Sequence, residues 1–412
     1  MRLGDPESGR AFVRKLAPYV TYAADYARQT SWLAVAFTFE GLRALGLPAA
    51  SLATFAIAFR EGMAARAPRF GDRGESDPAN WEQPYGRDQL HVALALMAAT
   101  ETRLREELEF ARRSAAELPG ITVLRREDFA QVPGGRTHLG FRDGISFPTI
   151  EGNGPNPLPD GTRPIAAGEF VLGYPGESGR PLALPQPEIL GRNGSFVGLR
   201  KLHVRVAAFR RFLRENATPA LAEELLAAKM VGRWRSGAPL ALSPERDDPE
   251  AADDPLRVNA FGYADDSSGL RCPLGAHVRR MNPRDAPLAV LSDVNLHRIV
   301  RHGATYGPPL PEGRLDDDGI ERGIFFIFIS ARAPETFEFL KSEWIESGNF
   351  VGLGAQKDPI AGANDGKGIF TIPLRPIRKR LHGLDRFTIT RGGAYGFLPS
   401  RSALRRLAEP WS

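Results

Sequence analysis

Short apolar runs alternate along the chain with segments in which apolar residues recur at helical spacing. The apolar runs predict buried strands, at residues 33–39 and in QLHVALALMA, GITVLRRED, SFVGLRKLHV, GIFFIFISA and RFTITRGGAYGFLPS. The amphipathic segments predict helices, in EGLRALGLP, at 52–64, 102–116 and 221–233, and in VAAFRRFLREN, PETFEFLKSEWIES and RSALRRLAE. Each half of the chain therefore mixes strands and helices in a split β-α-β order. This order is typical of an α+β fold in which antiparallel sheets carry helices on one face.

Residues 152–194 interrupt the pattern, because proline and glycine cluster in EGNGPNPLPDGTRP and LGYPGESGRPLALPQP. Irregular segments of this length are usually functional or connect domains. The chain has 412 residues, which agrees with about two to three domains. We therefore predict an N-terminal domain over residues 1–160, with GFRDG near its end. The predicted C-terminal domain covers residues 161–412 and begins with the connector.

The composition is that of an ordinary globular protein, with 42% hydrophobic and 25% charged residues. The net charge is +5, and the basic residues are dispersed among acidic ones, so we expect no nucleic-acid-binding stripe. Cys272 is the only cysteine, which excludes an intrachain disulfide, a cysteine-rich zinc site and an iron–sulfur cluster. No apolar run is long enough to span a membrane, and MRLGDPESGR lacks the apolar core of a signal peptide. We therefore expect a cytoplasmic protein without a membrane span.

The segment GFRDG places Arg142 and Asp143 between two glycines. Gly140 and Gly144 permit a positive φ and a close approach of the backbone to another group. Asp-Gly is also a common turn dipeptide, so this segment alone favours a surface turn.

Among seven histidines, His277 is distinguished by Arg279 and Arg280, which follow it in CPLGAHVRRMNPRD. An imidazole beside guanidinium groups suits a haem, because the imidazole can bind the iron and the arginines can pair with the propionates. A helix end with a basic face explains the same residues, and this segment alone favours that simpler interpretation.

A second basic cluster lies in NLHRIVRHGATYG. Arg298 and Arg301 are three residues apart, a spacing that predicts one face of a helix. His297 and His302 flank them and compete with His277 as ligand candidates. The chain contains no HExxH, GxSxG or P-loop, and no GxGxxG after a strand, which disfavours zinc peptidases, serine hydrolases, NTPases and nicotinamide enzymes.

Taken together, these segments resemble the dye-decolorizing peroxidases. GFRDG matches the GxxDG motif of that family, AHVRRMNPRD looks like its proximal-histidine segment, and HRIVRHGATYG looks like its distal-arginine segment. VAFTFEGLRALGLP, ERGIFFIFISA and RFTITRGGAYGFLPS are also similar to the larger-chain subgroup, and the matching segments span almost the whole chain. One departure is that only MRLG precedes DPESGRAFVRKL, where relatives have an extra strand. This indicates a first strand that is shortened or missing, or a start codon that was placed late.

The resemblance implies two ferredoxin-like domains of the dimeric α+β barrel type, with haem b bound mainly by the C-terminal one. His277 would be the iron ligand, and Asp358 in KDPIAG would accept the proton on its Nδ1. Phe326 and Phe328, on one face of a strand, would line the distal pocket. The resemblance gives Arg142 no role.

The implied activity is the reduction of hydrogen peroxide through a ferryl intermediate, followed by oxidation of dyes, phenols or similar one-electron donors. Asp143 would take a proton from peroxide and return it to the leaving oxygen. Arg301, which is always protonated, would stabilise the developing negative charge. The expected partners are hydrogen peroxide and small aromatic or dye reductants, and a homo-oligomer is left open. The alternatives are a haem-binding or haem-handling protein with little turnover, which needs no distal acid and arginine, and a redox-inert domain.

Overall fold

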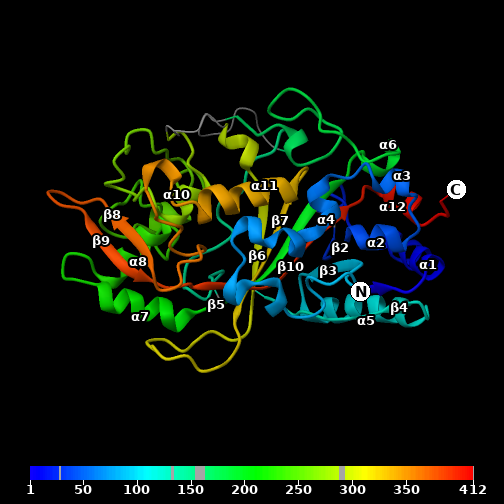
Figure 1. Ribbon diagram of the computed structural model, residues 1–412, viewed down its shortest axis with the longest axis horizontal. Helices are drawn as coiled ribbons and strands as arrows, with labels where there is room; N and C mark the ends of the chain where they lie inside the picture. The colour runs from blue at the N-terminus through cyan, green and yellow to red at the C-terminus, as the bar shows by residue number, and fades with distance from the viewer. Residues whose placement is uncertain (27–28, 131–133, 154–162, 287–292, 412) are drawn as a thin grey trace.

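The computed structural model describes residues 1–26, 29–130, 134–153, 163–286 and 293–411. Its centre is a six-stranded sheet with the strand order β3-β2-β10-β5-β7-β6, in which all neighbouring strands are antiparallel (Figure 1). The strands are β2 (Ser31–Phe37), β3 (Val92–Ala98), β5 (Ser195–Val204), β6 (Val300–Tyr306), β7 (Gly323–Ser330) and β10 (Thr388–Leu398). Five of these strands follow the predicted apolar runs, whereas β6 takes the place of a predicted helix. The predicted α+β class with antiparallel sheets is confirmed.

Two small sheets accompany the central one. β1 (Arg2–Leu3) pairs with β4 (Ile121–Thr122), so the strand predicted over GITVLRRED is wrong beyond its first residues. The remainder of that segment is mostly charged and partly or fully exposed, and it pairs with no other strand. β8 (Gly368–Ile372) and β9 (Lys379–Leu384) form a hairpin at the end of the molecule that lies away from the C-terminus (Figure 1).

Five of the α-helices named below begin at a side chain that accepts a first-turn N–H, as Thr100 does from the amide of Arg103 at the start of α5. The helices are α1 (Pro6–Leu16), α2 (Phe39–Ala44), α3 (Ala49–Leu52), α4 (Ile57–Arg66), α5 (Glu101–Ala116), α6 (Glu188–Gly191), α7 (Val206–Asn216), α8 (Glu223–Val231), α9 (Pro249–Asp253), α10 (His277–Met281), α11 (Ala333–Phe339) and α12 (Arg401–Leu407). A π-helix, Leu340–Glu346, continues α11. Among the described residues, no helix combines the length and the apolar character that crossing a bilayer requires.

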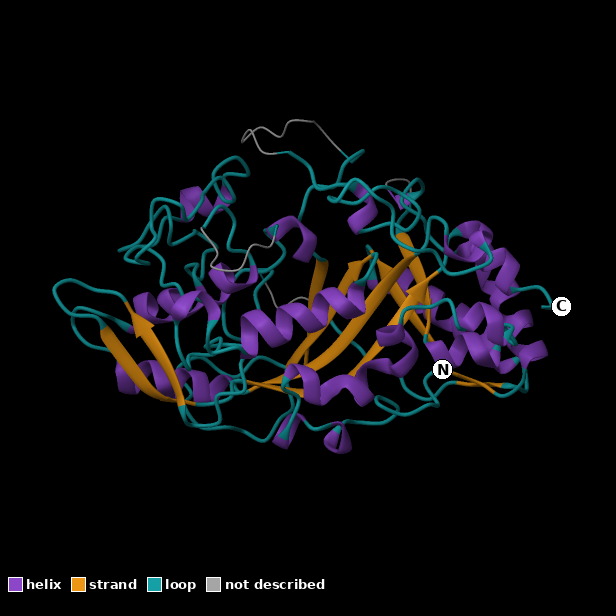
Figure 2. Ribbon diagram, turned by 45° about the horizontal axis from the view of Figure 1, so that its top comes forward, coloured by secondary structure: helices purple, strands orange, loops and turns teal. Residues whose placement is uncertain are grey.

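One face of the central sheet is covered in part by α4 and α11, and α11 lies across the strands (Figure 2). Phe337 of α11 stacks on Phe328 of β7, with ring centroids 4.7 Å apart. Met63 of α4 lies against Arg200 of β5. Burial of these side chains holds the two helices on the sheet.

The residues of the central sheet come from both predicted domains, since β2 and β3 belong to 1–160 and the other four strands belong to 161–412. A second apolar core joins α7 and α8 to the β8–β9 hairpin. The predicted boundary at residue 160 and part of the proline- and glycine-rich connector lie outside the described residues. The division into two domains therefore stays a prediction.

Two predicted helices are corrected. The helix at 52–64 is broken between α3 and α4, because Phe55 turns inward to pack on Phe59 and Phe397 with centroids 5.3 and 5.4 Å away. The segment at 298–301 enters strand β6, which pairs with the apolar strand β7 along its whole length. Tertiary pairing overrides the helical spacing of the two arginines.

Candidate active site

A cavity of about 360 Å³ lies against the covered face of the central sheet. Its size falls within the usual range for small-molecule and cofactor sites. Strands β5, β6, β7 and β10 supply one wall, and α8, α10 and the π-helix supply another. Most of the wall is apolar, from residues that include Leu139, Val231, Val278, Ile299, Ile324, Phe326, Phe337 and Leu340. Polar and charged side chains also line it, and two pairs of them carry candidate chemistry.

The first polar group is the pair Asp143 and Arg301. Arg301 Nη1 donates to Asp143 Oδ1 at 2.8 Å, although the two residues are 158 positions apart in the chain. Their side chains are 19% and 38% exposed, and both line the cavity. The pair combines a carboxylate that can accept a proton with a fixed cation that can donate hydrogen bonds.

The backbone around Asp143 explains the glycines of GFRDG. Gly140 has φ +87° and Gly144 has φ +73°, so the expected positive φ is confirmed at both positions. Gly303 on β6 is a third glycine that the sequence did not single out. A Cβ at Gly303 would lie 2.6 Å from Asp143 Oδ2, so the strand needs glycine there to seat the carboxylate.

The second polar group is the pair His277 and Asp358. His277 is the first residue of α10, and its Nδ1 lies 2.9 Å from Asp358 Oδ2. Asp358 is completely buried, which alone would raise the pKa of its carboxyl, but the neighbouring His277 and Arg280 outweigh burial and lower it. A carboxylate only accepts, so Nδ1 carries the proton. The lone pair of Nε2 is therefore the one available to a metal in the cavity.

Arg279 and Arg280 lie outside the cavity wall, and their predicted role as propionate partners is corrected. Arg279 donates to Asp266 at 2.9 Å and to the Cys272 carbonyl at 2.7 Å. Arg280 donates to the Trp344 carbonyl at 2.6 Å. Both guanidinium groups are almost fully buried, at 3% and 0% exposure, and they tie α10 to neighbouring segments.

Arg298, which the sequence noted without assigning a role, is a cation that lines the cavity. Burial, together with the nearby Arg284 and Arg301, lowers the pKa of its guanidinium to about 10. Within the described part of the chain no carboxylate offsets this charge. A half-buried cation without a carboxylate partner suits an anionic group in the cavity.

The competing histidines are placed differently from His277. His302 is exposed on β6, where side chains alternate between the two faces, so it points away from the face of Arg301. His297 lines the cavity, but its ring stacks on Phe339 with centroids 3.9 Å apart. Burial, as the larger effect, and Arg332 lower the pKa of His297 to about 4.

The two phenylalanines of β7 share a face, as expected, but only Phe326 reaches the cavity. Phe328 is fully buried beneath Phe337, so its predicted place in the pocket wall is wrong. Ile324, two residues earlier on the same face, lines the cavity instead. An apolar pair, Ile324 and Phe326, thus forms the wall that belongs to β7.

Comparison with known proteins gives one consistent result. The family model described as "DyP dimeric alpha+beta barrel domain" matches residues 19–122. Dye-decolorizing peroxidase msp1 of Mycetinis scorodonius is 31% identical over 90% of this chain and 75% of its own length. A dye-decolorizing peroxidase of Mycena epipterygia is 33% identical over 91% of this chain and 75% of its own length.

Solved structures agree. An ancestral D-type dye-decolorizing peroxidase superposes with a TM-score of 0.84 at 29% identity, covering 99% of this chain and 94% of that one. The DyP-type peroxidase of Auricularia auricula-judae gives the same TM-score and coverage at 27% identity. A further related structure, a complex with 2,6-dimethoxyphenol, has a TM-score of 0.82 at 28% identity, again over 99% and 94% of the two chains.

Proposed function

The chain belongs to the dye-decolorizing peroxidase family, and on that premise we propose that its cavity holds haem b, with His277 as the iron ligand. The enzyme is a peroxidase that oxidises dyes and phenols with hydrogen peroxide. We assign the chemistry of peroxide to Asp143 and Arg301.

The observation that carries the haem assignment is the hydrogen bond at His277. Its Nδ1 proton is held by the buried Asp358, which fixes the ring and makes Nε2 more basic. The cavity wall beside it is apolar and large enough for a planar cofactor, and Arg298 supplies an unbalanced positive charge for a propionate. A single imidazole ligand with an acidic hydrogen-bond partner is a suitable donor set for haem iron.

When bound, the haem would supply the two electrons that reduce peroxide and would regain them one at a time from the donor. The protein handles the protons. Asp143 accepts a proton from hydrogen peroxide and returns it to the oxygen that leaves as water. Arg301 holds the Asp143 carboxylate at 2.8 Å and stabilises negative charge as the O–O bond breaks.

An apolar part of the cavity wall lies beside this chemistry. Ile324 and Phe326 place apolar side chains on the face of β7 beside Gly303 and Asp143. A low-dielectric wall strengthens the interaction between Arg301 and the developing charge. The related complex with 2,6-dimethoxyphenol supports small phenols as reducing substrates for this chain.

Haem binding by His277 variants tests the proposal. Haem is titrated into the haem-free protein, and the Soret band is followed for the wild type, His277→Ala and His297→Ala. Because His297 also lines the cavity, it is a matched control. We expect His277→Ala to lose most of its haem and His297→Ala to keep it. A full Soret band in His277→Ala, with loss in His297→Ala, would reverse the ligand assignment.

A further inference from the structure

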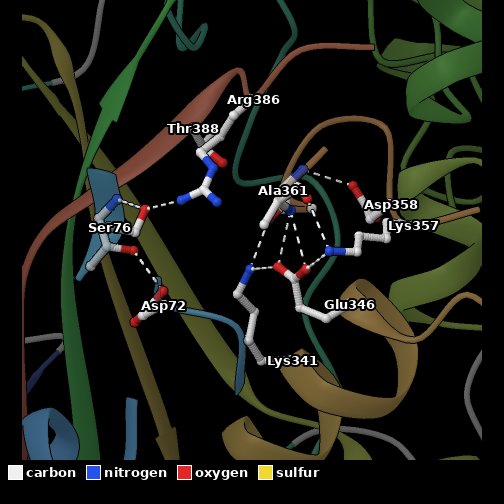
Figure 3. A network of polar contacts seen from close by, with 12 residues as sticks. Asp72, Ser76, Lys341, Glu346, Lys357, Asp358, Ala361, Arg386 and Thr388 are labelled. Carbon is white, nitrogen blue, oxygen red and sulfur yellow. Dashed lines mark hydrogen bonds and ion pairs between the residues drawn. The ribbon is translucent and has the colours of Figure 1, made fainter. Parts of the chain in front are cut away.

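A buried cluster of charges holds the loop that carries Asp358, and Glu346 is at its centre (Figure 3). Glu346 accepts from Lys341 Nζ at 2.7 Å and from Lys357 Nζ at 3.2 Å. It also accepts from the amide of Ala363 at 3.1 Å. Its side chain is only 10% exposed. One carboxylate thus connects two lysines to the backbone of the loop.

The contacts run without a gap from Glu346 to the histidine. Lys341 Nζ donates to the Ala361 carbonyl at 2.8 Å, as Figure 3 shows. The amide of Ala361 donates to Asp358 Oδ1 at 2.8 Å, while the other oxygen of Asp358 faces His277 Nδ1. Moving the loop at Ala361 therefore moves the carboxylate on which the His277 ring depends.

The π-helix explains why Lys341 and Glu346 can meet. In an α-helix, residues five positions apart point about 140° away from each other. In a π-helix the repeat is i to i+5, so Lys341 and Glu346 lie on one face of Leu340–Glu346. The same segment offers the Ile345 carbonyl to the amide of Asp358, at 2.8 Å. Single π-helical turns occur frequently at functional sites.

Arg280 ties the histidine to this π-helix from the other side. It lies three residues after His277 in α10 and donates to the Trp344 carbonyl at 2.6 Å. Its second Nη donates to the Gln356 carbonyl, two residues before Asp358. Arg280 therefore anchors both His277 and Asp358 to the π-helix. This structural role takes the place of the propionate binding that the sequence suggested for Arg280.

We propose that Glu346 is a positioning residue, which holds Asp358 on His277 Nδ1 and so sets the basicity of the iron-ligating nitrogen. This rests on the proposed function, because it takes His277 as the ligand. An intact buried charge cluster adds little net stability, whereas removing one of its partners is costly. Burial would raise the pKa of Glu346, but the two lysines and the Ala363 amide lower it, so the carboxylate stays charged and keeps both lysines.

The test compares Glu346→Gln with Glu338→Gln. Glu338 lies in α11, has similar burial, and pairs with Arg66 at 2.6 Å without contacting the Asp358 loop. In the ferrous haem protein, resonance Raman spectroscopy gives the iron–histidine stretching band. In the haem-free protein, hydrogen exchange reports on the amides of Ile360 and Ala361.

We expect Glu346→Gln to shift the iron–histidine band to lower frequency, as Asp358→Asn does, and to speed exchange of the loop amides about tenfold. Glu338→Gln should change neither. Adding Glu346→Gln to Asp358→Asn should not shift the band further, because Glu346 acts through Asp358. If Glu346→Gln does not fold, Lys341→Gln takes its place. Lys341→Gln should also lower the frequency of the iron–histidine band and speed exchange of the loop amides.

Equal bands in Glu346→Gln and Glu338→Gln, or additive shifts in the double variant, would overturn the positioning role. Failure of the proposed function looks different. An iron–histidine band that survives in His277→Ala would show that another residue binds the iron. Loop exchange in the haem-free protein would still report whether Glu346 holds the Asp358 loop.

Discussion

Replacing Asp143 by Asn separates the position of this side chain from its proton chemistry. The amide oxygen of Asn can still accept from Arg301 Nη1, which now lies 2.8 Å from Oδ1, so the arginine should stay in place. The pair is partly exposed, at 19% and 38%, so its loss should change the free energy of unfolding by about 1 kcal/mol or less. What disappears is proton transfer, which is typically worth about 10²–10⁴-fold in rate.

Stopped-flow absorption after mixing the haem protein with hydrogen peroxide measures that rate across pH. We expect Asp143→Asn to react about 10²–10⁴-fold more slowly and to lose the acid limb of the profile, since an amide side chain cannot accept the proton of peroxide. Arg301→Leu should be slower by about 10²–10³-fold but should keep the acid limb, because the carboxylate of Asp143 is still present.

The matched control for this experiment is Asp253→Asn. Asp253 pairs with Arg142, the residue next to Asp143, at 2.6 Å, but its side chain is 75% exposed and lies outside the cavity wall. Its removal should leave the peroxide rate unchanged. If Asp143→Asn keeps both the wild-type rate and the acid limb, Asp143 is not the base. GFRDG would then have a structural role only.

Three further predictions follow from the geometry. Gly303→Ala should slow the peroxide reaction while the fold stays intact, because the new Cβ would lie 2.6 Å from Asp143 Oδ2 and displace the carboxylate; unchanged stopped-flow rates would contradict this. Asp72→Ala should lower the free energy of unfolding in urea by about 3–5 kcal/mol, because Arg200, which is 2% exposed, loses its bidentate partner. A loss below about 1 kcal/mol would show that Arg200 does not depend on Asp72. His297 has a folded pKa of about 4 against 6.5 in the open chain, so the unfolded state gains protons first and stability falls as pH drops from 6.5 to about 4. His297→Phe should flatten that part of the urea-midpoint profile, and an unchanged slope would show that another group is responsible.

The sequence predicted the apolar strands better than it predicted the structure of the segments beside them in the chain. The apolar runs that became β5 and β7 are buried in the sheet, and their pattern alone indicates strands. Arg298 and Arg301 share a helical spacing, yet the chain enters an edge strand there, because pairing with β7 is a tertiary effect that local spacing does not contain. The break at Phe55 has the same origin, since the partners of its ring come from distant segments.

Within the active site, motifs predicted which residues meet, and charge alone did not predict which arginines face the cavity. Asp143 and Arg301 were found through segments that resemble a family, and they lie in contact across 158 residues. Arg279 and Arg280 lie two and three residues after His277, but they donate hydrogen bonds to buried groups of the protein and do not face the cavity. Arg298 lines the cavity without a carboxylate partner among the described residues, which the sequence alone does not show. The cytoplasmic location and any homo-oligomer stay predictions.

The central claim is that this chain binds haem through His277 and uses it to reduce peroxide. The most direct measurement is the absorption spectrum of the haem-reconstituted protein, before and after one equivalent of hydrogen peroxide and again after a phenol. We predict a Soret band that changes on addition of peroxide and returns when the phenol is added. A Soret band that peroxide leaves unchanged would identify a haem-handling protein and contradict the peroxidase assignment.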